Sequence, residues 1–531
     1  FILAGSMSWA WANPLLDVPT LMPMRGVVNA ALVAASGALV PLAYTWFATG
    51  KPDPLMSARG LAAGAIAGMA FGPFFPPWAA VVVGLVVGLL VLALVASLAL
   101  LGQDATALTM MTVDGFAVFF KVLVIIVMIL VVTAAGDYMQ SRSRHQGEFY
   151  TMLLAATLAM TVAVSANNLV LIYLGMEFLS ITSYVLAGFI RDDKRSSEAA
   201  IKYFLYGAVA SGVMLYGLSL LYGATGSIYL TEIAAAFKNT KGLTASLGLP
   251  ASILVITGFG FKASLAPFHQ WAPDTYDGAP TPVTAFLSTA SKATGFALLL
   301  RVLLVALPAV QTQWTAILAG IAMATMTLGN LAALRQTNVK RLLAYSSIAQ
   351  AGYILIGLVA ATSEPGKTFN GINGVLIYLF AYLFTNIGAF ITVTAVEDAT
   401  GSVELKDWSG LITRQPFLAI MMLIFMLSLA GIPPTGGFIG KFFVFGAAIQ
   451  TQAFALAAVA LVNAAIAAFY YLSVVRYMFF EPQGERTPFK ISRPVQAVVA
   501  IAMIMTLVIG IFPGPFITWA TEAVLPMLAS L

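Results

Sequence analysis

Long apolar runs, separated by short polar joints, recur along almost the whole chain. About 20 apolar residues cross the roughly 30 Å hydrocarbon core of a bilayer as a helix, so each run predicts a transmembrane span. The run at 60–101 is either one long helix or two short ones bent at residues 73–77. The pattern therefore predicts an all-α, polytopic membrane protein with 14 or 15 spans. They cover residues 27–49, 60–101, 114–136, 148–166, 168–190, 199–224, 248–268, 281–306, 313–334, 341–362, 373–396, 415–446, 453–479 and 494–513.

Proline and glycine interrupt two of these runs, each time beside a lysine. Lys262 precedes Pro267 in GFGFKASLAPFH (258–269), and Lys441 follows Pro433 and Pro434 in LAGIPPTGGFIGK (429–441). Each interruption falls in the fourth helix of a block of five. Because an odd number of spans inverts the second block relative to the first, the arrangement predicts two inverted repeats with a transport site near the midplane.

The two five-helix blocks divide the chain into five parts. The first and second repeats, each expected to form a half-channel, cover 148–306 and 313–479. Residues 1–112 hold the N-terminal transmembrane helices, 113–147 the third helix with a loop, and 480–531 a C-terminal loop with the last helix. No part of this pattern predicts a separate soluble domain.

Basic residues gather in alternate loops, whereas opposite joints such as 102–112 and 307–314 carry almost no charge. By the positive-inside rule the basic loops face the cytoplasm. We therefore expect a multi-pass protein of the bacterial inner (plasma) membrane. The loops contain Arg142 and Arg144; Arg191, Lys194 and Arg195; Arg335, Lys340 and Arg341; Lys406 and Arg414; and Arg486, Lys490 and Arg493.

Composition narrows the chemistry of this membrane protein. Only 9% of the residues are charged, against about 25% in soluble domains. The net charge of +5 is scattered rather than gathered on one stripe, which argues against a nucleic-acid partner. With no cysteine and two histidines, the chain offers no ligands for iron-sulfur clusters and few for haem or zinc. We expect no cofactor and no metal on this chain, so any redox centre belongs to a partner.

Ionisable side chains inside apolar runs are the main candidates for chemistry, since each costs about 2.5–3.5 kcal/mol at the centre of a membrane helix. Protonation of lysine responds to burial and to neighbouring charge, while arginine stays protonated. Lysines at interior positions therefore indicate a proton relay. Its expected members are Glu177, Lys202, Lys262, Lys292 and Lys441.

Structural roles compete with this interpretation. Glu177 and Lys202 would also serve as a fixed ion pair between adjacent helices. Lys262, Lys292 and Lys441 outnumber the interior acids, which makes a purely structural role harder for them. Lys121 and Arg301 lie near helix ends, where long side chains reach the interface. Loop acids such as Asp274, Asp277 and Glu198 are expected to be solvated or paired with nearby basic residues.

His269 follows Pro267 at the first interruption. A lone histidine is more often a hydrogen-bonded structural residue than a relay member. Its ordinary pKa nevertheless suits a connecting role in proton transfer. Both interpretations stay open for His269.

Four long motifs resemble the antiporter-like, proton-translocating subunits of respiratory complex I, and more narrowly their N-type members. They are FGFKASLAPFHQWAPDTYDGAPTPVTAFLSTASKATGFALLLR (259–301), VLIYLGMEFLSITSYVLAGF, LAGIPPTGGFIGKFFVF and QTNVKRLLAYSSIAQAGY. The resemblance covers roughly residues 112–480, and the first hundred residues depart from it. A lysine at the position of Lys441 is typical of the N-type and L-type subunits, whereas the M-type subunit has a glutamate at this position. The SKATGF motif and the lack of a long lateral helix after residue 513 favour N.

This resemblance implies a role for each interior charge. Glu177 and Lys202 would modulate the first half-channel, and Lys262 would be its central carrier. Lys292 would pass the proton sideways, and Lys441 would release it outward. Electrons would move from NADH to quinone in partner subunits, so the resemblance places FMN, iron-sulfur clusters and quinone there. It implies as partners the other antiporter-like and small membrane subunits, the peripheral redox arm and the lipid bilayer.

Other functions compete with this one. A multisubunit sodium/proton antiporter would share the fold and the buried lysines, and a relative driven by ferredoxin would share the subunit type. Interior lysines without a carboxylate cage favour H⁺ over Na⁺, which prefers oxygen ligands. A static membrane scaffold is the alternative outside transport. Nothing in the sequence resembles a quinone head-group site.

Overall fold

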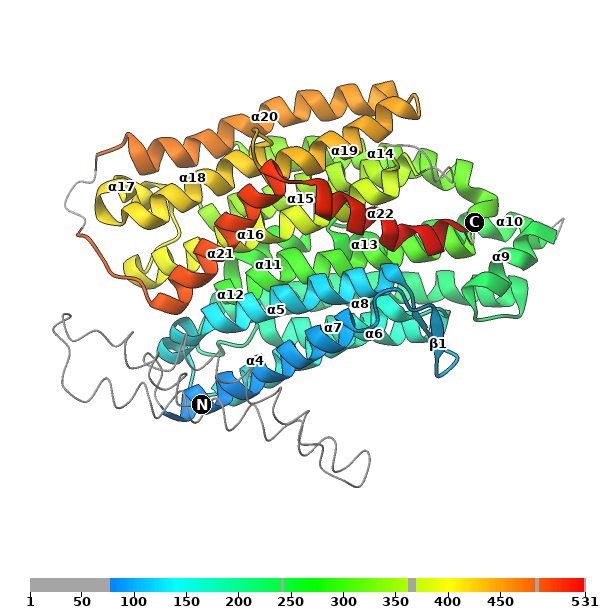
Figure 1. Ribbon diagram of the computed structural model, residues 1–531, viewed down its shortest axis with the longest axis horizontal. Coiled ribbons are helices and arrows are strands. Elements are labelled where there is room, and N and C mark those ends of the chain that lie inside the picture. Colours follow the sequence, from blue (N-terminus) through cyan, green and yellow to red (C-terminus); the bar gives the residue numbers. More distant parts are fainter. Residues whose placement is uncertain (1–76, 240–242, 362–368, 483–486, 530–531) are drawn as a thin grey trace.

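The computed structural model describes residues 77–239, 243–361, 369–482 and 487–529 (Figure 1). The helix expected at 27–49 and the first part of the run at 60–101 lie outside these residues. Within them, 11 helices are long and apolar enough to cross a membrane. The prediction of a helical, multi-pass membrane protein is confirmed at this level.

The first described helices of the bundle are α4 (Pro77–Leu98), α5 (Gly115–Arg142), α6 (Gln146–Ser165), α7 (Leu169–Ala187) and α8 (Lys194–Thr225). Side chains cap the starts of three of them, α5, α7 and α8. Asp114, Asn168 and Asp193 accept hydrogen bonds from the otherwise unpaired amides of Ala117, Leu171 and Arg195. Such caps explain why these helices start directly after short polar joints.

A short hairpin between α4 and α5 is an exception to the all-α expectation. Strands β1 (Ala105–Ala107) and β2 (Met111–Val113) pair antiparallel, with Thr106 opposite Thr112. The hairpin is tied to the bundle because the Asn167 amide donates to the Met110 carbonyl. A joint with little charge and with small and β-branched residues is compatible with such a turn, but nothing in the apolar pattern singles it out.

A second unexpected element is α9 (Leu230–Asn239), in the segment where only a loop was expected. Leu230, Ile233 and Phe237 are buried, so one face of this short helix packs on the bundle. It precedes α10 (Leu243–Ala263).

The first interrupted run forms two helices, α10 and α11 (Trp271–Gly278). Ser264 takes a left-handed conformation with φ +59°, and the Leu265 amide closes the turn by donating to the Gly260 carbonyl at 2.8 Å. The Trp271 indole donates to the Phe261 carbonyl at 2.9 Å, which occupies another acceptor at the helix end. Pro267 lies in the non-helical segment between the two helices.

The run at 281–306 is continuous but not uniformly α-helical. It consists of α12 (Thr281–Phe286), the π-helical turn η1 (Leu287–Ser291), α13 (Lys292–Arg301) and a second π-helical turn η2 (Val302–Ala306). Such turns shift the helical register and often occur at functional sites. Here η1 immediately precedes Lys292.

The second half begins with the 3₁₀ turn η3 (Pro308–Val310), followed by α14 (Gln311–Ala333), α15 (Val339–Val359) and α16 (Gly371–Thr400). The helix α16 is buried from Gly371 to Val396 and lies in the middle of the bundle (Figure 1). After η4 (Leu405–Trp408) and α17 (Leu411–Arg414), the second interrupted run forms α18 (Pro416–Ala430) and α19 (Gly436–Gln450), and α20 (Phe454–Phe479) follows.

Two helices follow α20, where one was expected. They are α21 (Arg493–Ile511) and α22 (Gly514–Ala529). The Trp519 ring of α22 lies 4.5 Å from the ring of Phe119 on α5 and 5.4 Å from that of Phe380 on α16. This packing anchors a helix that lies beyond the last span expected from the sequence, which ends at residue 513.

The same local structure occurs in both halves. The Leu169 amide donates to the Ile228 carbonyl at 2.9 Å, and the Val339 amide to the Val403 carbonyl at 2.8 Å. The following breaks also match, since the Ile432 amide donates to Leu427 as Leu265 does to Gly260. Gly226 follows α8 with a φ of +70°, and Gly401 follows α16 with a φ of +69°. This left-handed conformation favours glycine.

The bundle has two distinguishable ends. At one end, which we call the basic end, α5 and α16 finish and α8, α15 and α21 begin. An ion pair of 2.6 Å between Arg142 and Asp398 joins α5 and α16 there. The hairpin end carries β1 and β2 (Figure 1).

Candidate functional site: buried lysines at two helix breaks

Lys262 lies one residue before the end of α10, with 1% of its surface exposed. Its ammonium group donates to the Tyr203 hydroxyl at 3.2 Å and to the Ser180 hydroxyl at 3.4 Å. The Tyr203 ring stacks on Trp271 at 4.2 Å, so the start of α11 positions the tyrosine that binds the lysine. The negative charge of Glu177 also acts on Lys262.

Glu177 and Lys202 do not form the ion pair that the sequence analysis expected. Lys202 instead pairs with Glu198 at 2.8 Å and with Asp274 at 2.7 Å. Its side chain is 39% exposed, so it is not an interior charge in the isolated chain. Glu177 has a buried Oε1 atom with no hydrogen-bond partner. The helix spacing favours Glu198, one turn from Lys202, and the break brings Asp274 of α11 into reach.

Lys292 begins α13 directly after η1 and is buried. Its ammonium group donates to both oxygens of Ser347 on α15, to the hydroxyl at 2.6 Å and the carbonyl at 2.8 Å. The Tyr382 hydroxyl on α16 donates to the same serine hydroxyl at 2.9 Å. Lys292 is therefore held by neutral groups of the second half.

Lys441 lies on α19, just after the second break. Its ammonium group donates to the carbonyls of Leu429 and Ala430, each at 2.8 Å. These are the last carbonyls of α18, where the helix dipole favours a positive charge. The ring of Tyr353 lies 5.0 Å from the same nitrogen, a further favourable contact for a cation. Pro433 and Pro434 lie in the segment between α18 and α19.

A chain of polar side chains connects the surroundings of Lys292 with those of Lys441. Ser346, next to Ser347, hydrogen-bonds the Tyr471 hydroxyl at 2.6 Å. Gln350 donates to that hydroxyl and to the Leu429 carbonyl, each at 3.0 Å. The same carbonyl accepts from Lys441, so α15 and α20 carry a nearly continuous hydrogen-bonded path.

Lys262 and Lys292 lie on helices in close contact. A Cβ placed on Gly295 would come 3.2 Å from the Cβ of Lys262 and 3.3 Å from the Ala263 amide nitrogen. Glycine at this position lets α13 approach α10 one turn beyond Lys292. The structure thus brings Lys262, Lys292 and Lys441 into one buried series, with Lys202 outside it.

His269 lies in the first break and is 8% exposed. Its Nδ1 atom is buried and forms no hydrogen bond with the described residues. The sequence left a structural and a connecting role open, and both stay open, because the histidine also interacts with the Pro267 backbone.

Arg301 does not extend to the interface as a long side chain near a helix end was expected to do. It is buried and binds Asp114 through two hydrogen bonds of 2.9 and 3.0 Å. Burial tends to raise the pKa of Asp114, but the charge and hydrogen bonds of Arg301 outweigh it and hold that pKa below the usual value. The pair clamps the start of α5 to the end of α13.

The apolar pattern does not single out the buried Lys340 or the partly buried Glu397. Lys340, in the first turn of α15, is 2% exposed and lies 4.0 Å from Glu397 near the end of α16. Lys340 was grouped with the cytoplasmic loop because Arg341 follows it. Arg341 does turn outward and pairs with Asp274 at 2.7 Å. No signal in the sequence distinguishes the two neighbours.

Residues 166–467 match the family described as NADH:quinone oxidoreductase/Mrp antiporter, TM. Curated relatives cover most of both chains. The NADH-quinone oxidoreductase subunit N of Heliobacterium modesticaldum is 44% identical over 411 residues, 77% of this chain and 85% of that protein. That of Moorella thermoacetica is 42% identical over 413 residues, 77% and 85% of the two chains.

Solved structures agree with the relatives. A chain of respiratory complex I from Thermus thermophilus with bound aureothin is 34% identical, with a TM-score of 0.70 over 92% of this chain and 98% of that one. A chain of the Mrp complex from Dietzia sp. is 19% identical with a TM-score of 0.77, over 94% and 97%, which shows a shared fold. The match over residues 166–467 and the relatives at 42–44% identity show that the chain belongs to the NADH:quinone oxidoreductase/Mrp antiporter family, among its N subunits.

Proposed function

We propose that this chain is a proton-translocating membrane subunit of an NADH:quinone oxidoreductase. The observation that carries the proposal is the series Lys262, Lys292 and Lys441. Each is buried, and its hydrogen-bond partners are hydroxyls and carbonyls. Among the described residues, none of the three forms an ion pair with a carboxylate.

Neutral partners suit a proton carrier. A lysine paired with a buried carboxylate leaves an uncompensated charge when it loses its proton. Hydroxyl and carbonyl groups remain hydrogen-bonded to either form of the amine, as acceptors or, for hydroxyls, also as donors. A modest change in the surrounding electrostatics is then enough to move the proton. One pKa unit corresponds to about 1.4 kcal/mol.

The arrangement of these residues supports one direction of transfer. Glu177 biases Lys262, which would pass its proton to Lys292 across the contact at Gly295. The path through Ser346, Tyr471 and Gln350 would carry it on to Lys441 for release at the hairpin end. Electron transfer in partner subunits would shift the charge near Glu177 and so drive the series. Lys202 would modulate it from the surface through Asp274.

The domain organisation supports this mechanism. The matching hydrogen bonds at both helix breaks support two repeats, at 148–306 and 313–479. The second repeat would be inverted relative to the first, in a chain that crosses the membrane 14 or 15 times. Exposed apolar side chains on α7 and α8, such as Leu174, Phe178 and Val209, offer a face for lipid or a neighbouring membrane subunit. FMN, iron-sulfur clusters and quinone would reside on other subunits in the bacterial inner membrane.

The relatives favour this function over a sodium/proton antiporter, because the curated proteins at 42–44% identity are N subunits and the Mrp chain shares 19%. NADH-driven proton pumping tests it in membranes carrying Lys262→Met, with the exposed Lys238→Met as control. We expect an assembled complex that loses pumping, while the control pumps normally. Unchanged pumping in an assembled Lys262→Met complex would refute the proposal, and pumping that requires Na⁺ would favour the antiporter.

A further inference from the structure

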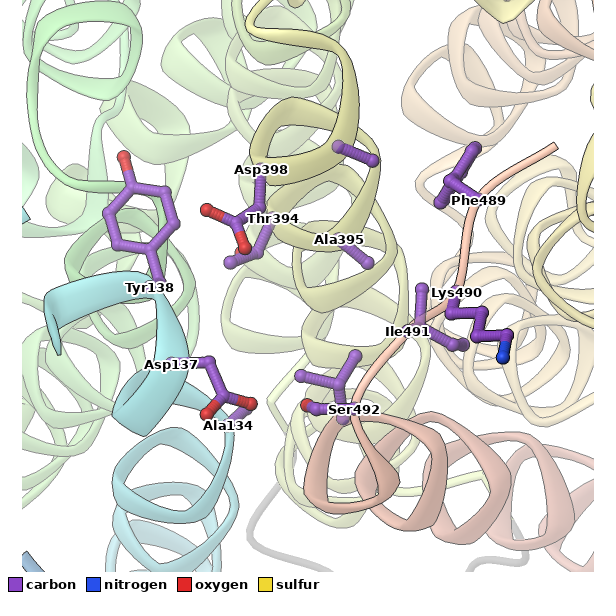
Figure 2. Close-up of a pocket in the computed structure, with 12 residues that line it drawn as sticks. Ala134, Asp137, Tyr138, Thr394, Ala395, Asp398, Phe489, Lys490, Ile491 and Ser492 are labelled. Atoms are coloured by element: carbon purple, nitrogen blue, oxygen red, sulfur yellow. The ribbon is translucent and has the colours of Figure 1, made fainter. Parts of the chain in front are cut away.

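A cavity of about 370 Å³ opens at the basic end between α5, α16 and the segment leading into α21 (Figure 2). Asp137 of α5 and Asp398 of α16 line it from two helices, and Phe489, Lys490 and Ser492 close another side. The cavity thus holds two carboxylates and an ammonium group among apolar and hydroxyl-bearing side chains. None of its lining residues belongs to the lysine series described above.

The inner wall of this cavity leads to a charge pair made by the partly buried Glu397 and the buried Lys340. Tyr138 lines the cavity, is 4% exposed, and donates its hydroxyl hydrogen bond to Glu397 at 3.5 Å. Glu397 also accepts a hydrogen bond from Thr281. On its other side, the Lys340 nitrogen lies 4.0 Å away and donates to the Ala279 carbonyl at 2.9 Å.

Four charged groups on neighbouring elements act on Lys340: Glu397 of α16, Asp277 of α11, Arg195 of α8 and Asp193 before it. Arg195 and Asp277 neutralise one another in an ion pair of 2.7 Å. Among the described residues, Glu397 is the carboxylate that lies within ion-pair distance of Lys340. A buried lysine and a carboxylate that is 18% exposed, 4.0 Å apart, contribute little net stability, which favours a chemical role for the pair.

Polar groups continue from this pair toward Lys292. Lys340 and Ser347 share one face of α15, about 10 Å apart along its axis. Ser347 is the residue that binds Lys292. Asn386, about three turns before Glu397 on α16, donates to Ser288 of η1 at 2.7 Å. The Oδ1 atom of Asn386 is buried with no hydrogen-bond partner among the described residues, and such groups order internal water.

We propose that this cavity takes up protons at the basic end and that Glu397 and Lys340 deliver them to Lys292. The proposal rests on the proposed function and adds an uptake route to it. Glu397 accepts one proton from the cavity, and Lys340 releases one proton inward. Transfer of the proton from Glu397 to Lys340 then restores the ionised pair, so one proton enters and one leaves in each cycle.

The test is NADH-driven proton pumping by the whole complex carrying Glu397→Gln. Glutamine has the shape of glutamate and keeps one acceptor oxygen, while its amide group can donate to the hydroxyl that bound the other oxygen, so the local packing is preserved and the titratable group is lost. We expect an assembled complex whose pumping is lost, and at least partial recovery in Glu397→Asp. An assembled Glu397→Gln complex that pumps like the unaltered one overturns the route.

A second variant tests the mouth of the cavity. Asp137→Asn should lower the pumping rate at pH 8, where protons are scarce, and have little effect at pH 6. The matched control is Asp104→Asn, an exposed carboxylate near the hairpin, which should show no pH-dependent difference. Equal effects of the two variants, or none at pH 8, contradict the proposal.

Comparison with Lys262→Met separates this route from the proposed function. If Lys262→Met abolishes pumping and Glu397→Gln does not, the uptake route alone is wrong. If both complexes assemble and pump normally, the proton-pump function fails as well.

Discussion

The ammonium group of Lys441 on α19 binds the carbonyl oxygen of Leu429 on α18 at 2.8 Å, across the second helix break. A side chain from one half-helix thus occupies the exposed backbone end of the other. The contact uses the negative end of the α18 dipole instead of a carboxylate, so the lysine is stabilised without a partner that would trap its proton.

Replacing Lys441 by arginine distinguishes a mobile proton from a fixed charge. Arginine retains the positive charge at the α18 terminus but stays protonated under all physiological conditions. We expect Lys441→Arg to assemble and to lose redox-driven pumping, measured as acidification in inverted membrane vesicles. Lys238→Arg serves as the exposed control. Normal pumping by Lys441→Arg would show that this position contributes charge only.

Gly431 provides the space for Lys441 at the break. Its φ is +89°, and an added Cβ would lie 2.8 Å from Cδ of Lys441. We expect Gly431→Ala to lower the free energy of unfolding by about 1–3 kcal/mol. Alanine would be strained at this φ, and its Cβ would displace the Lys441 side chain, so both effects destabilise the folded protein. Thermal unfolding in detergent measures this loss. Gly212→Ala is the matched control, since no atom lies within 4 Å of its added Cβ.

Glu177 can be tested without breaking a strong contact. Its Oε1 atom has no hydrogen-bond partner, so Glu177→Gln removes a negative charge near Lys262 and no ion pair among the described residues. We expect thermal stability to change by less than about 0.5 kcal/mol while pumping falls. A large loss of stability with proportionate loss of assembled complex would assign Glu177 a structural role instead.

The Asp114–Arg301 clamp predicts a structural effect. Arg301→Met leaves Asp114 without its buried counter-ion, and breaking such a pair costs about 3–5 kcal/mol. Thermal unfolding in detergent should detect a large decrease in the unfolding temperature. Arg335→Met, on the exposed turn after α14, is the control.

The pH dependence of the same clamp follows from Asp114. The pKa of Asp114 in the folded protein lies below the ordinary 3.8. The clamp therefore stabilises the folded protein fully above pH 3.8, and this stabilisation is lost as the pH falls through the lowered pKa. The stability difference between the unaltered protein and Asp114→Asn should therefore be largest near neutral pH and shrink below pH 3.8. A difference that grows on acidification would contradict a clamp made by ionised Asp114.

The sequence by itself determined that the chain is a membrane protein, since long apolar runs have no other stable environment. It also located both breaks, because Pro267, Pro433 and Pro434 and the neighbouring glycines act on the backbone within a few residues. The lysines Lys262, Lys292 and Lys441 were visible as charges with apolar neighbours on both sides, a local property of the chain.

Only the tertiary structure decided which of these charges meet. Lys202 binds Asp274 rather than Glu177 because the first break turns α11 toward α8, and helix spacing does not encode that direction. Lys340 is buried beside Glu397 while its neighbour Arg341 faces outward, a difference set by the packing of α15 against α16. Contacts between helices depend on side chains distant in the chain, so the proposed proton path rests on packing, whereas the lysines proposed to carry the proton are readable from the order of the amino acids.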